Sequence, residues 1–452
     1  MRHNEAREPG QTTPWQKVGD DVLSPLWRGG PVYWLLLGLS FALVVAGAWL
    51  WNRQIDLGLG VAGITRPAGW GVYIATFVFW VGITHSGTLM SAIFYLFGVP
   101  WRAAISRLAE ATTLLALLTA AFFPLIHLGR PWLAFWLIPY PNQRELWVNF
   151  RSPLIWDVFA VGTYFTISLL FGFIGTLPDL AAARDRSSGW KKSVYGFFSF
   201  RWRGTGTQWF HFRAAYLLLA ALVIPLAISV HSVVSWDFAM GIVPGWHSTI
   251  FAPYFVAGAI FSGLAMITLL VILLRRAYRL ERYITPEHFD KLGQLLLLMS
   301  LIMSYVYAVE FFLGWYGGDP VERASLYYRA FGAYRELFWT MLVCNSVAPL
   351  LLFSGRLRRN PRVQFCLAVL ILTGMYLERI LIVPVSLTHE YAPYVWGLYR
   401  PTIYEYGILA ASFGFFFFCF LVFIKLVPAI PMYEVRELAH AQPPQAAAEV
   451  AR

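Results

Sequence analysis

The feature that most constrains this chain is a series of ten apolar segments. Of its 452 residues 58% are hydrophobic and only 13% are charged, whereas a soluble domain averages about 25% charged residues. An apolar run of about 20 residues is long enough to cross a bilayer as a helix. The segments lie at about 31–51, 70–97, 107–128, 154–177, 214–235, 250–274, 293–316, 331–353, 363–387 and 402–427. They predict an all-α polytopic membrane protein with about ten transmembrane helices.

The two ends of the chain differ from this pattern. Residues 1–30 are polar and lack the early apolar core of a signal peptide. Residues 431–452 are rich in Ala, Pro and Gln, a composition typical of disorder. We therefore expect a polar N-terminal segment, one membrane domain over 31–430 and a disordered tail, with the first apolar segment acting as the insertion signal.

The formal net charge of +11 is unevenly distributed, because basic residues concentrate in alternate connections. The basic residues of these connections are Arg102, Arg107, Arg184, Arg186, Lys191, Lys192, Arg201, Arg203, Arg275, Arg276, Arg279, Arg282, Lys291, Arg356, Arg358, Arg359 and Arg362. The positive-inside rule places this face, and with ten helices both termini, in the cytoplasm. Charge spread over many loops beside a membrane disfavours a nucleic-acid partner.

The cysteines and histidines argue against a metal centre held by this chain. Cys344, Cys366 and Cys419 are solitary within apolar segments, so we expect no cysteine-ligated iron–sulfur cluster and no covalently attached haem. Haem b would need two histidines at one depth on facing helices. His85 lies near mid-membrane and His231 outside, so no such pair is evident.

Two ionisable residues at the ends of consecutive apolar segments are the strongest site candidates. His127 lies where the third segment ends and Asp157 where the fourth begins. In a hairpin of two transmembrane helices, the chain leaves and re-enters the membrane on the same side. The charge pattern places that side outside the cell. Ionisable groups are expensive in hydrocarbon, so such residues are functional candidates by default. The pair suits a proton-accepting site at the lipid boundary.

Polar side chains also recur at helical spacing inside several apolar segments. They make either a hydrated proton path or contacts between helices, since Ser and Thr in membrane helices commonly bond their own backbone or a neighbour. The candidates for a path are His85, Glu110, Tyr305, Glu310, Glu378 and Arg379. Residues 231–248, aromatic and containing Gly and Pro, are expected to form a connection that docks on another protein or covers a site.

Long motifs resemble the NrfD/PsrC family of integral quinone-reactive subunits. The first are Gly82–Ala92, Phe123–Trp132 and Pro139–Arg144. Residues 146–157 and Val243–Thr249 narrow the resemblance to the larger, ActC-type membrane subunit of bacterial alternative complex III. The similarity spans all ten apolar segments but neither polar end.

The resemblance implies a fold and a set of partners. Two four-helix bundles, about 70–235 and 250–387, would be flanked by the first and last helices. The chain would lie in a bacterial inner membrane and oxidise menaquinol near the periplasmic face. Electrons would pass to a docked iron–sulfur subunit and then to c-type haem subunits, beside a second NrfD-like membrane subunit and membrane lipid. No complete enzymatic activity is expected of this chain alone.

The resemblance also implies roles for the residues at the outer face. The family's pocket His and Asp map onto His127 and Asp157. An imidazole, with an unperturbed pKa of about 6.5, is a natural acceptor for a quinol proton. Arg130 would steady developing charge, and Trp132 and Trp136, with Phe135, would line an apolar entrance. These aromatics are equally typical of an interface belt.

Two other functions remain open. One is the membrane anchor of a molybdenum-containing reductase, such as a polysulfide reductase, within the same family. The other is a secondary transporter, although transporters commonly have helices broken at mid-membrane and the interruptions here lie mainly at segment ends. A contribution to proton translocation is a further expectation, resting on the polar stripes.

Overall fold

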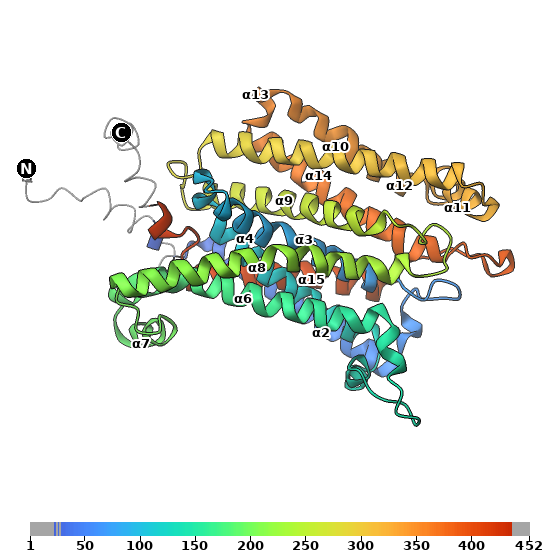
Figure 1. Ribbon diagram of the computed structural model, residues 1–452, viewed down its shortest axis with the longest axis horizontal. Coiled ribbons are helices and arrows are strands. Elements are labelled where there is room, and N and C mark those ends of the chain that lie inside the picture. Colours follow the sequence, from blue (N-terminus) through green and yellow to red (C-terminus); the bar gives the residue numbers. More distant parts are fainter. Residues whose placement is uncertain (1–21, 24–25, 27–28, 436–452) are drawn as a thin grey trace, which may run out of the picture.

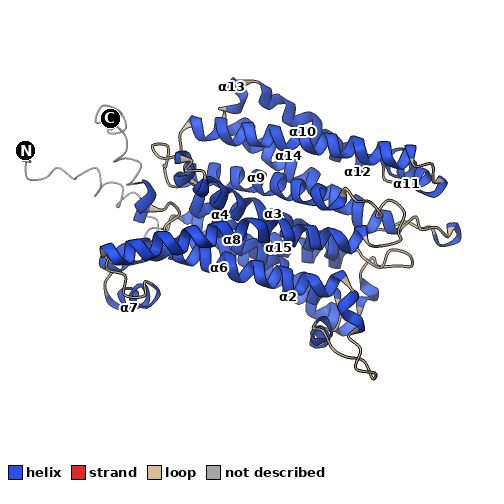
Figure 2. Cartoon of the chain, viewed as in Figure 1, coloured by secondary structure: helices blue, strands red, loops and turns tan. Residues whose placement is uncertain are grey.

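The computed structural model describes residues 22–23, 26 and 29–435, and this part of the chain is helical without any strand (Figure 2). Ten helical stretches within it are long and apolar enough to cross a membrane, which confirms the predicted fold class. The helices are α2 (Pro31–Leu57), α3 (Val72–Leu96), α4 (Ser106–Ala120), α5 (Phe122–His127), α6 (Pro153–Asp185), α7 (Gly189–Phe198), α8 (Gly206–Ala239), α9 (Phe251–Ala277), α10 (Pro286–Tyr316), α11 (Pro320–Phe331), α12 (Arg335–Leu342), α13 (Gly355–Arg358), α14 (Pro361–Ile380) and α15 (Ile403–Leu426).

Short helical turns connect or continue these helices. They are η1 (Leu59–Val61), η2 (Pro100–Ala104), η3 (Pro131–Leu137), η4 (Val148–Arg151), η5 (Val343–Val347), η6 (Ala348–Phe353), η7 (Leu381–Val385) and η8 (Pro393–Val395). Two of them, η5 and η7, are π-helical. Such π segments are rare and are often found at functional sites.

Local sequence signals explain where several helices begin. Proline occupies the first turn of α2, α6, α10, α11 and α14, where its missing N–H is not needed. Thr205 and Gln208 form a capping box at the start of α8, as do Thr402 and Glu405 at the start of α15. These caps satisfy N–H groups that the helix itself leaves free.

The helices pack in three groups (Figure 1). Helices α3, α4, α6 and α8 contact one another, and α9, α10, α12 and α14 form a second group. Helices α2 and α15 pair with each other, and α15 also contacts α3 and α4. The first two groups meet where α3 contacts α9 and α14 and where α8 contacts α9. Helices α3 and α9 are therefore the centre of the molecule.

The outside of this assembly is apolar and the inside contains polar groups. Helix α2 exposes large side chains such as Trp34, Leu35 and Leu39, whereas Thr84, His85 and other polar residues of α3 are buried. This distribution suits a protein whose surface faces lipid, because hydrocarbon does not drive apolar groups inward.

Two expectations for the connections and ends were wrong. Residues 231–239, expected in a connection, form the last turns of α8. Residues 431–435, expected to begin a disordered tail, pack against the bundle: the Met432 amide donates to Asp179 at 3.1 Å and Arg102 pairs with Glu434 at 3.0 Å. The expectations for residues 1–21 and 436–452 lie outside the described residues.

Candidate proton-handling site

His127 is held at the end of the membrane domain where α5 and α8 end and α6 begins, called the outer end below. Gly129, two residues on, has φ +69°, a conformation that favours glycine, and turns the chain into η3. The Gln54 side-chain amide donates to the Ile126 carbonyl at 3.1 Å, and the Tyr73 hydroxyl donates to the side-chain oxygen Oε1 of Gln54. This buried network from α2 and α3 fixes the backbone immediately before His127.

Asp157 meets a second carboxyl group that sequence reasoning did not select. Asp157 lies in the second turn of α6, and its side chain hydrogen-bonds with that of Asp237 in the last turn of α8. The neighbouring Trp156 and Trp236 rings also meet, with centroids 6.2 Å apart. A hydrogen bond between two carboxyl groups requires a proton between them. The pair is therefore a ready proton store.

The three acid–base groups of the outer end have buried polar atoms without partners. These atoms are His127 Nδ1, Asp157 Oδ1 and Asp237 Oδ1. Within the described chain, His127 and Asp157 make no hydrogen bond or ion pair with each other, although η3 contacts both of their helices. Buried polar atoms are normally hydrogen-bonded, so such exceptions call for an explanation. A bound molecule with hydroxyl or carbonyl groups would supply partners.

The remaining residues expected at this site lie at the surface. Arg130 is exposed, and Trp132 and Trp136 have 62% and 48% of their surface accessible. Phe135 and Trp136 pack together, and Trp136 contacts Tyr140. This part of the chain projects beyond the helix ends at one side of the molecule (Figure 1), and these aromatics are exposed rather than buried in a pocket.

Glu110 anchors a polar cluster near the opposite, inner end, where α4 and α8 begin. Ser91 donates to its carboxylate at 2.8 Å and Tyr216 at 2.7 Å. Arg107 lies 3.8 Å from the other carboxylate oxygen and pairs with Asp179 at 2.9 Å. All five side chains are buried. Opposite charges and hydroxyl donors together neutralise this cluster inside the protein.

His85 of α3 and His231 of α8 are in contact with each other, which the sequence did not reveal. Their rings lie 4.5 Å apart between centroids and are fully buried. The expectation that no two histidines share one depth was wrong, because α8 continues through His231 instead of ending before it. The rings contact each other directly, which leaves no space for a haem iron between them.

The surroundings of the two histidines are polar on one side and aromatic on the other. His85 Nδ1 lies 2.8 Å from the Val81 carbonyl, and the His85 ring stacks on Tyr164. Tyr164 in turn donates to the Thr84 carbonyl at 3.0 Å. Neither ring nitrogen of His231 has a hydrogen-bond partner. His231 thus ends one polar chain within the first helix group.

Arg379 begins a second polar chain across the group boundary. Its guanidinium lies 4.6 Å above the Phe255 ring, which also contacts His231. Gly258 permits this approach, because a Cβ there would lie 2.9 Å from Arg379 Nη2. Arg379 and Glu378 form an ion pair at 3.3 Å. The cation–π contact therefore lies within the second helix group, and the ring contact between His231 and Phe255, 5.9 Å between centroids, joins it to the first group.

Glu378, next to Arg379 on α14, connects it to further polar residues of the second helix group. Tyr307 donates to its carboxylate, and the Asn345 amide donates to the Tyr307 oxygen at 2.9 Å. Asn345 belongs to the π segment η5, and Glu378 precedes the π segment η7. Ser300 donates to the Asn345 carbonyl at 2.6 Å. Both π segments thus border the same buried cluster.

Two further residues expected in a proton path lie apart from this cluster. Glu310 pairs with Arg329 at 2.8 Å near the outer end of α10. Tyr305 has 67% of its surface accessible and faces outward.

His389, beyond α14, is buried between Tyr328 and Trp396. Burial lowers the pKa of His389 to about 4.

Several site residues were missed from the sequence for identifiable reasons. Asp237 and His231 were assigned to a connection, although an apolar helix continuing to Phe238 would have placed both inside the membrane span. Gln54 and Asn345 carry no charge, so a search for ionisable residues passes over them. Within the described residues, no group of three or more His, Cys, Asp and Glu side chains is placed to hold a metal ion.

Comparison with known proteins gives one family and two relatives. The family model described as "Polysulphide reductase, NrfD" matches residues 60–389. The chain is 28% identical over 360 residues to a putative dimethyl sulfoxide reductase membrane subunit of Halobacterium salinarum, covering 77% of this chain and 76% of that protein. It is 22% identical over 427 residues to a selenate reductase subunit of Mesobacillus selenatarsenatis, covering 90% of this chain and 96% of the relative.

Proposed function

Because this chain belongs to the NrfD polysulphide reductase family, we propose that it is the quinol-interacting membrane subunit of an oxidoreductase complex. Quinol is oxidised at the outer end, and the electrons pass to an iron–sulfur subunit docked there. The observation that carries the proposal is the set of unpartnered buried atoms on His127, Asp157 and Asp237. A quinol hydroxyl, which both donates and accepts, matches an imidazole nitrogen and a carboxyl oxygen.

The chemistry requires two proton acceptors and an electron exit. A quinol that becomes a quinone loses two protons and two electrons. His127 accepts a hydroxyl proton, because its Nδ1 is buried and has no other partner. The Asp157–Asp237 pair holds one proton between two carboxyl groups, so its remaining carboxylate accepts a further proton and both groups become neutral. Both electrons leave to the partner subunit.

The names of the relatives bear on the choice of complex. Both are named as subunits of reductases, one for dimethyl sulfoxide and one for selenate. They favour a reductase complex with a molybdenum-containing catalytic subunit over alternative complex III. In either case quinol is the electron donor and the chemistry at His127 is the same. We further propose that the electron donor is menaquinol. The chain lies in a bacterial inner membrane with both of its termini in the cytoplasm.

A proton path is the second part of the proposal. It runs from Glu110 through the hydroxyl groups of α3 to His85, crosses to His231 and reaches Glu378 beyond Arg379. Support comes from the direct contact of the two imidazoles, 4.5 Å between centroids, within the first helix group, and from the contact of the His231 ring with Phe255 of the second group. Neutral imidazoles pass protons readily. The surface position of Tyr305 leaves it outside this path.

The test replaces the acid–base groups in the assembled complex. We expect His127→Gln and Asp157→Asn each to slow menadiol oxidation by about 100-fold, the usual contribution of a positioned acid or base. His247→Gln and Asp56→Asn are matched controls, because both residues are exposed. The controls should retain the full rate.

Assembly is measured separately, by co-purification of the partner subunits. A fully active His127→Gln complex would contradict the catalytic assignment. The identity of the co-purified subunits distinguishes a molybdenum-containing reductase from a complex with c-type haem subunits.

A further inference from the structure

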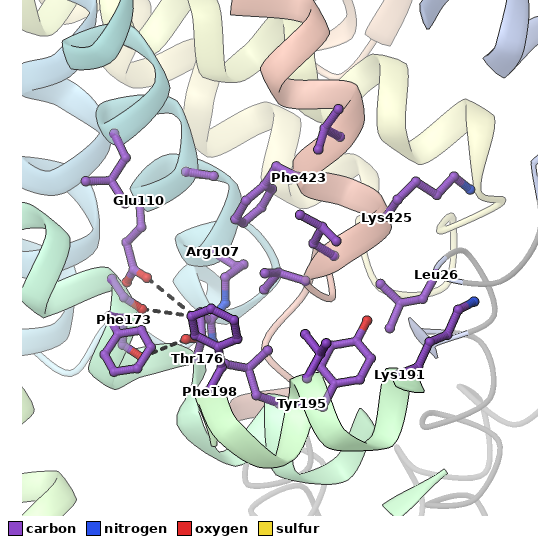
Figure 3. Close-up of a pocket in the computed structure, with 18 of the residues that line it drawn as sticks. Leu26, Arg107, Glu110, Phe173, Thr176, Lys191, Tyr195, Phe198, Phe423 and Lys425 are labelled. Atoms are coloured by element: carbon purple, nitrogen blue, oxygen red, sulfur yellow. Dashed lines mark hydrogen bonds and ion pairs between the residues drawn. The ribbon is translucent and has the colours of Figure 1, made fainter. Parts of the chain in front are cut away.

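A cavity of about 710 Å³ lies at the inner end, opposite His127 (Figure 3). Its volume falls within the roughly 300–1,000 Å³ typical of sites for small molecules. Helices α2, α4, α6, α7 and α15 all contribute to its walls. Exposed residues such as Trp34, Leu169 and Leu426 line it, so the cavity opens to the surface that faces lipid.

The cavity has an apolar body and a small polar end. Arg107 and Glu110 of α4 form the polar end, and both side chains are buried (Figure 3). Most of the remaining wall is apolar and includes Leu114, Phe173 and Phe423. A ligand that fits this cavity is therefore mostly apolar and carries few polar atoms.

Within the described chain, the polar end leaves one hydrogen-bond acceptor and one donor unused. The Oε1 atom of Glu110 accepts from Ser91 and Tyr216. Its Oε2 atom lies 3.8 Å from Arg107 Nη1, which is beyond hydrogen-bond distance. The Nη2 atom of Arg107 donates to Asp179, while its Nε atom is buried without a partner. A hydroxyl group offers both missing bonds, because it donates and accepts.

The lysines on the other side of the cavity (Figure 3) do not select its occupant. Both have partners: Lys425 Nζ lies 4.5 Å from the centre of the Tyr33 ring, and Lys191 Nζ lies 5.9 Å from that of Trp190. At the polar end, Arg107 already faces opposite charges. A neutral hydroxyl therefore suits the cavity better than an ionic head group.

We propose that this cavity binds a second molecule of quinol at the inner end. One ring hydroxyl donates to Glu110 Oε2 and accepts from Arg107 Nε. The aromatic ring packs against lining residues such as Phe173 and Phe423, and the prenyl chain reaches the lipid. A quinone has no hydroxyl hydrogen and leaves Oε2 unused, so the site prefers the reduced form.

The inner quinol is held and not oxidised, since the electron acceptor is proposed to dock at the opposite end. Binding there goes beyond the proposed function, because it requires no activity at the outer end. The bound hydroxyl completes the hydrogen bonding of the Arg107–Glu110 pair.

The test uses the purified complex and a menaquinone analogue with a photoreactive diazirine in its prenyl chain. The analogue is added as the quinol or as the quinone, and cross-linked peptides are identified by mass spectrometry. We expect cross-links to the cavity walls as well as near the outer end. At the cavity the quinol should be favoured by about tenfold, the value of one hydrogen bond to a charged group.

Competition identifies the kind of ligand. Excess menaquinol should remove the cavity cross-links, whereas excess phosphatidylglycerol or phosphatidylcholine should not. Displacement by a phospholipid as effective as that by menaquinol would overturn the proposal, and so would specific cross-links confined to the outer end.

Glu110→Gln tests the polar end. The glutamine keeps an oxygen for Ser91 and Tyr216 but replaces Oε2 with an amide donor, so the preference for quinol over quinone should disappear. Glu287→Gln is the control, because Glu287 is exposed and does not line the cavity; it should retain the preference. A preference that survives in Glu110→Gln would contradict the assignment of the hydroxyl site.

A volume variant tests the cavity independently of charge. Leu37 lines the cavity, so Leu37→Trp should reduce cavity cross-links of both forms, whereas Leu218→Trp, at an exposed position on α8, should not. Cavity labelling unaffected by Leu37→Trp would overturn the proposal. His127→Gln should lose menadiol oxidation and keep cavity labelling, which separates a failure of the outer site from a failure of the inner one.

Discussion

The two ends of the membrane domain treat buried charge in opposite ways. At the inner end, Arg107 pairs with Asp179 at 2.9 Å and lies 3.8 Å from Glu110, although the Arg107 Nε atom is buried without a hydrogen-bond partner. At the outer end, His127 and the Asp157–Asp237 pair leave buried atoms without partners. Opposite charges that pair hold helices together, whereas imidazole and carboxyl groups without an opposite charge leave bonding capacity for a substrate. Both ends carry ionisable groups, and the outer end is where we propose chemistry on a ligand.

The largest expected effect comes from opening the inner network. Arg107→Met leaves Asp179 as an unpaired buried charge, so the free energy of unfolding should fall by about 3–5 kcal/mol. R107M/D179L removes both charges and should recover most of it. Arg53→Met is the control, because its pair with Asp56 is exposed and 3.9 Å long and contributes less than about 1 kcal/mol. Loss of folded protein in detergent measures the effect. A stable R107M variant would contradict the distinction between the two ends.

The link between the ends is tested at His231. His231→Phe keeps an aromatic ring against Phe255 but removes both nitrogens. We expect quinol oxidation to continue while any proton release beyond the two from quinol is lost, as measured by a pH dye in vesicles. His211→Phe, at an exposed position of the same helix, should change nothing. An unchanged proton ratio in His231→Phe would argue against the path.

A smaller effect is expected at Gln54, which positions the backbone before His127 and takes no part in the proposed chemistry. Gln54→Leu removes the donor to the Ile126 carbonyl and leaves that buried acceptor unsatisfied, a loss of about 1–3 kcal/mol. Displacement of His127 should lower kcat/KM for quinol by roughly tenfold, the factor for ~1.4 kcal/mol, with assembly intact. Asn52→Leu, at an exposed position of the same helix, is the matched control. Equal activity of the two variants would show that Gln54 only packs.

The smallest effect concerns pH and a histidine outside both networks. Burial lowers the pKa of His389 from 6.5 to about 4, so the folded state disfavours its protonated form. Its contribution to the free energy of unfolding is complete above about pH 6.5 and is lost as the pH falls toward 4. As the pH falls below 6, the melting temperature of His389→Gln should therefore fall less than that of the unaltered chain. The corresponding difference in the free energy of unfolding should be less than about 1 kcal/mol. Parallel pH profiles would contradict this account.

Much of the fold followed from the sequence, and less of the site. Ten apolar segments correspond to ten helical stretches, since length and hydropathy suffice to mark helices that cross a bilayer. His127 and Asp157 were found because charge is rare in such segments. Asp237 and His231 were misplaced because the end of α8 depends on packing against α6 and α9, which hydropathy does not report.

By itself the sequence determined the class of protein, its family and the existence of ionisable groups inside the membrane. The tertiary structure decided which of those groups meet. Asp157 pairs with Asp237 eighty residues away, and His85 meets His231, because contacts between helices depend on rotation and depth rather than on order along the chain. Hydropathy constrains each helix separately, whereas a cluster of buried polar groups belongs to several helices at once.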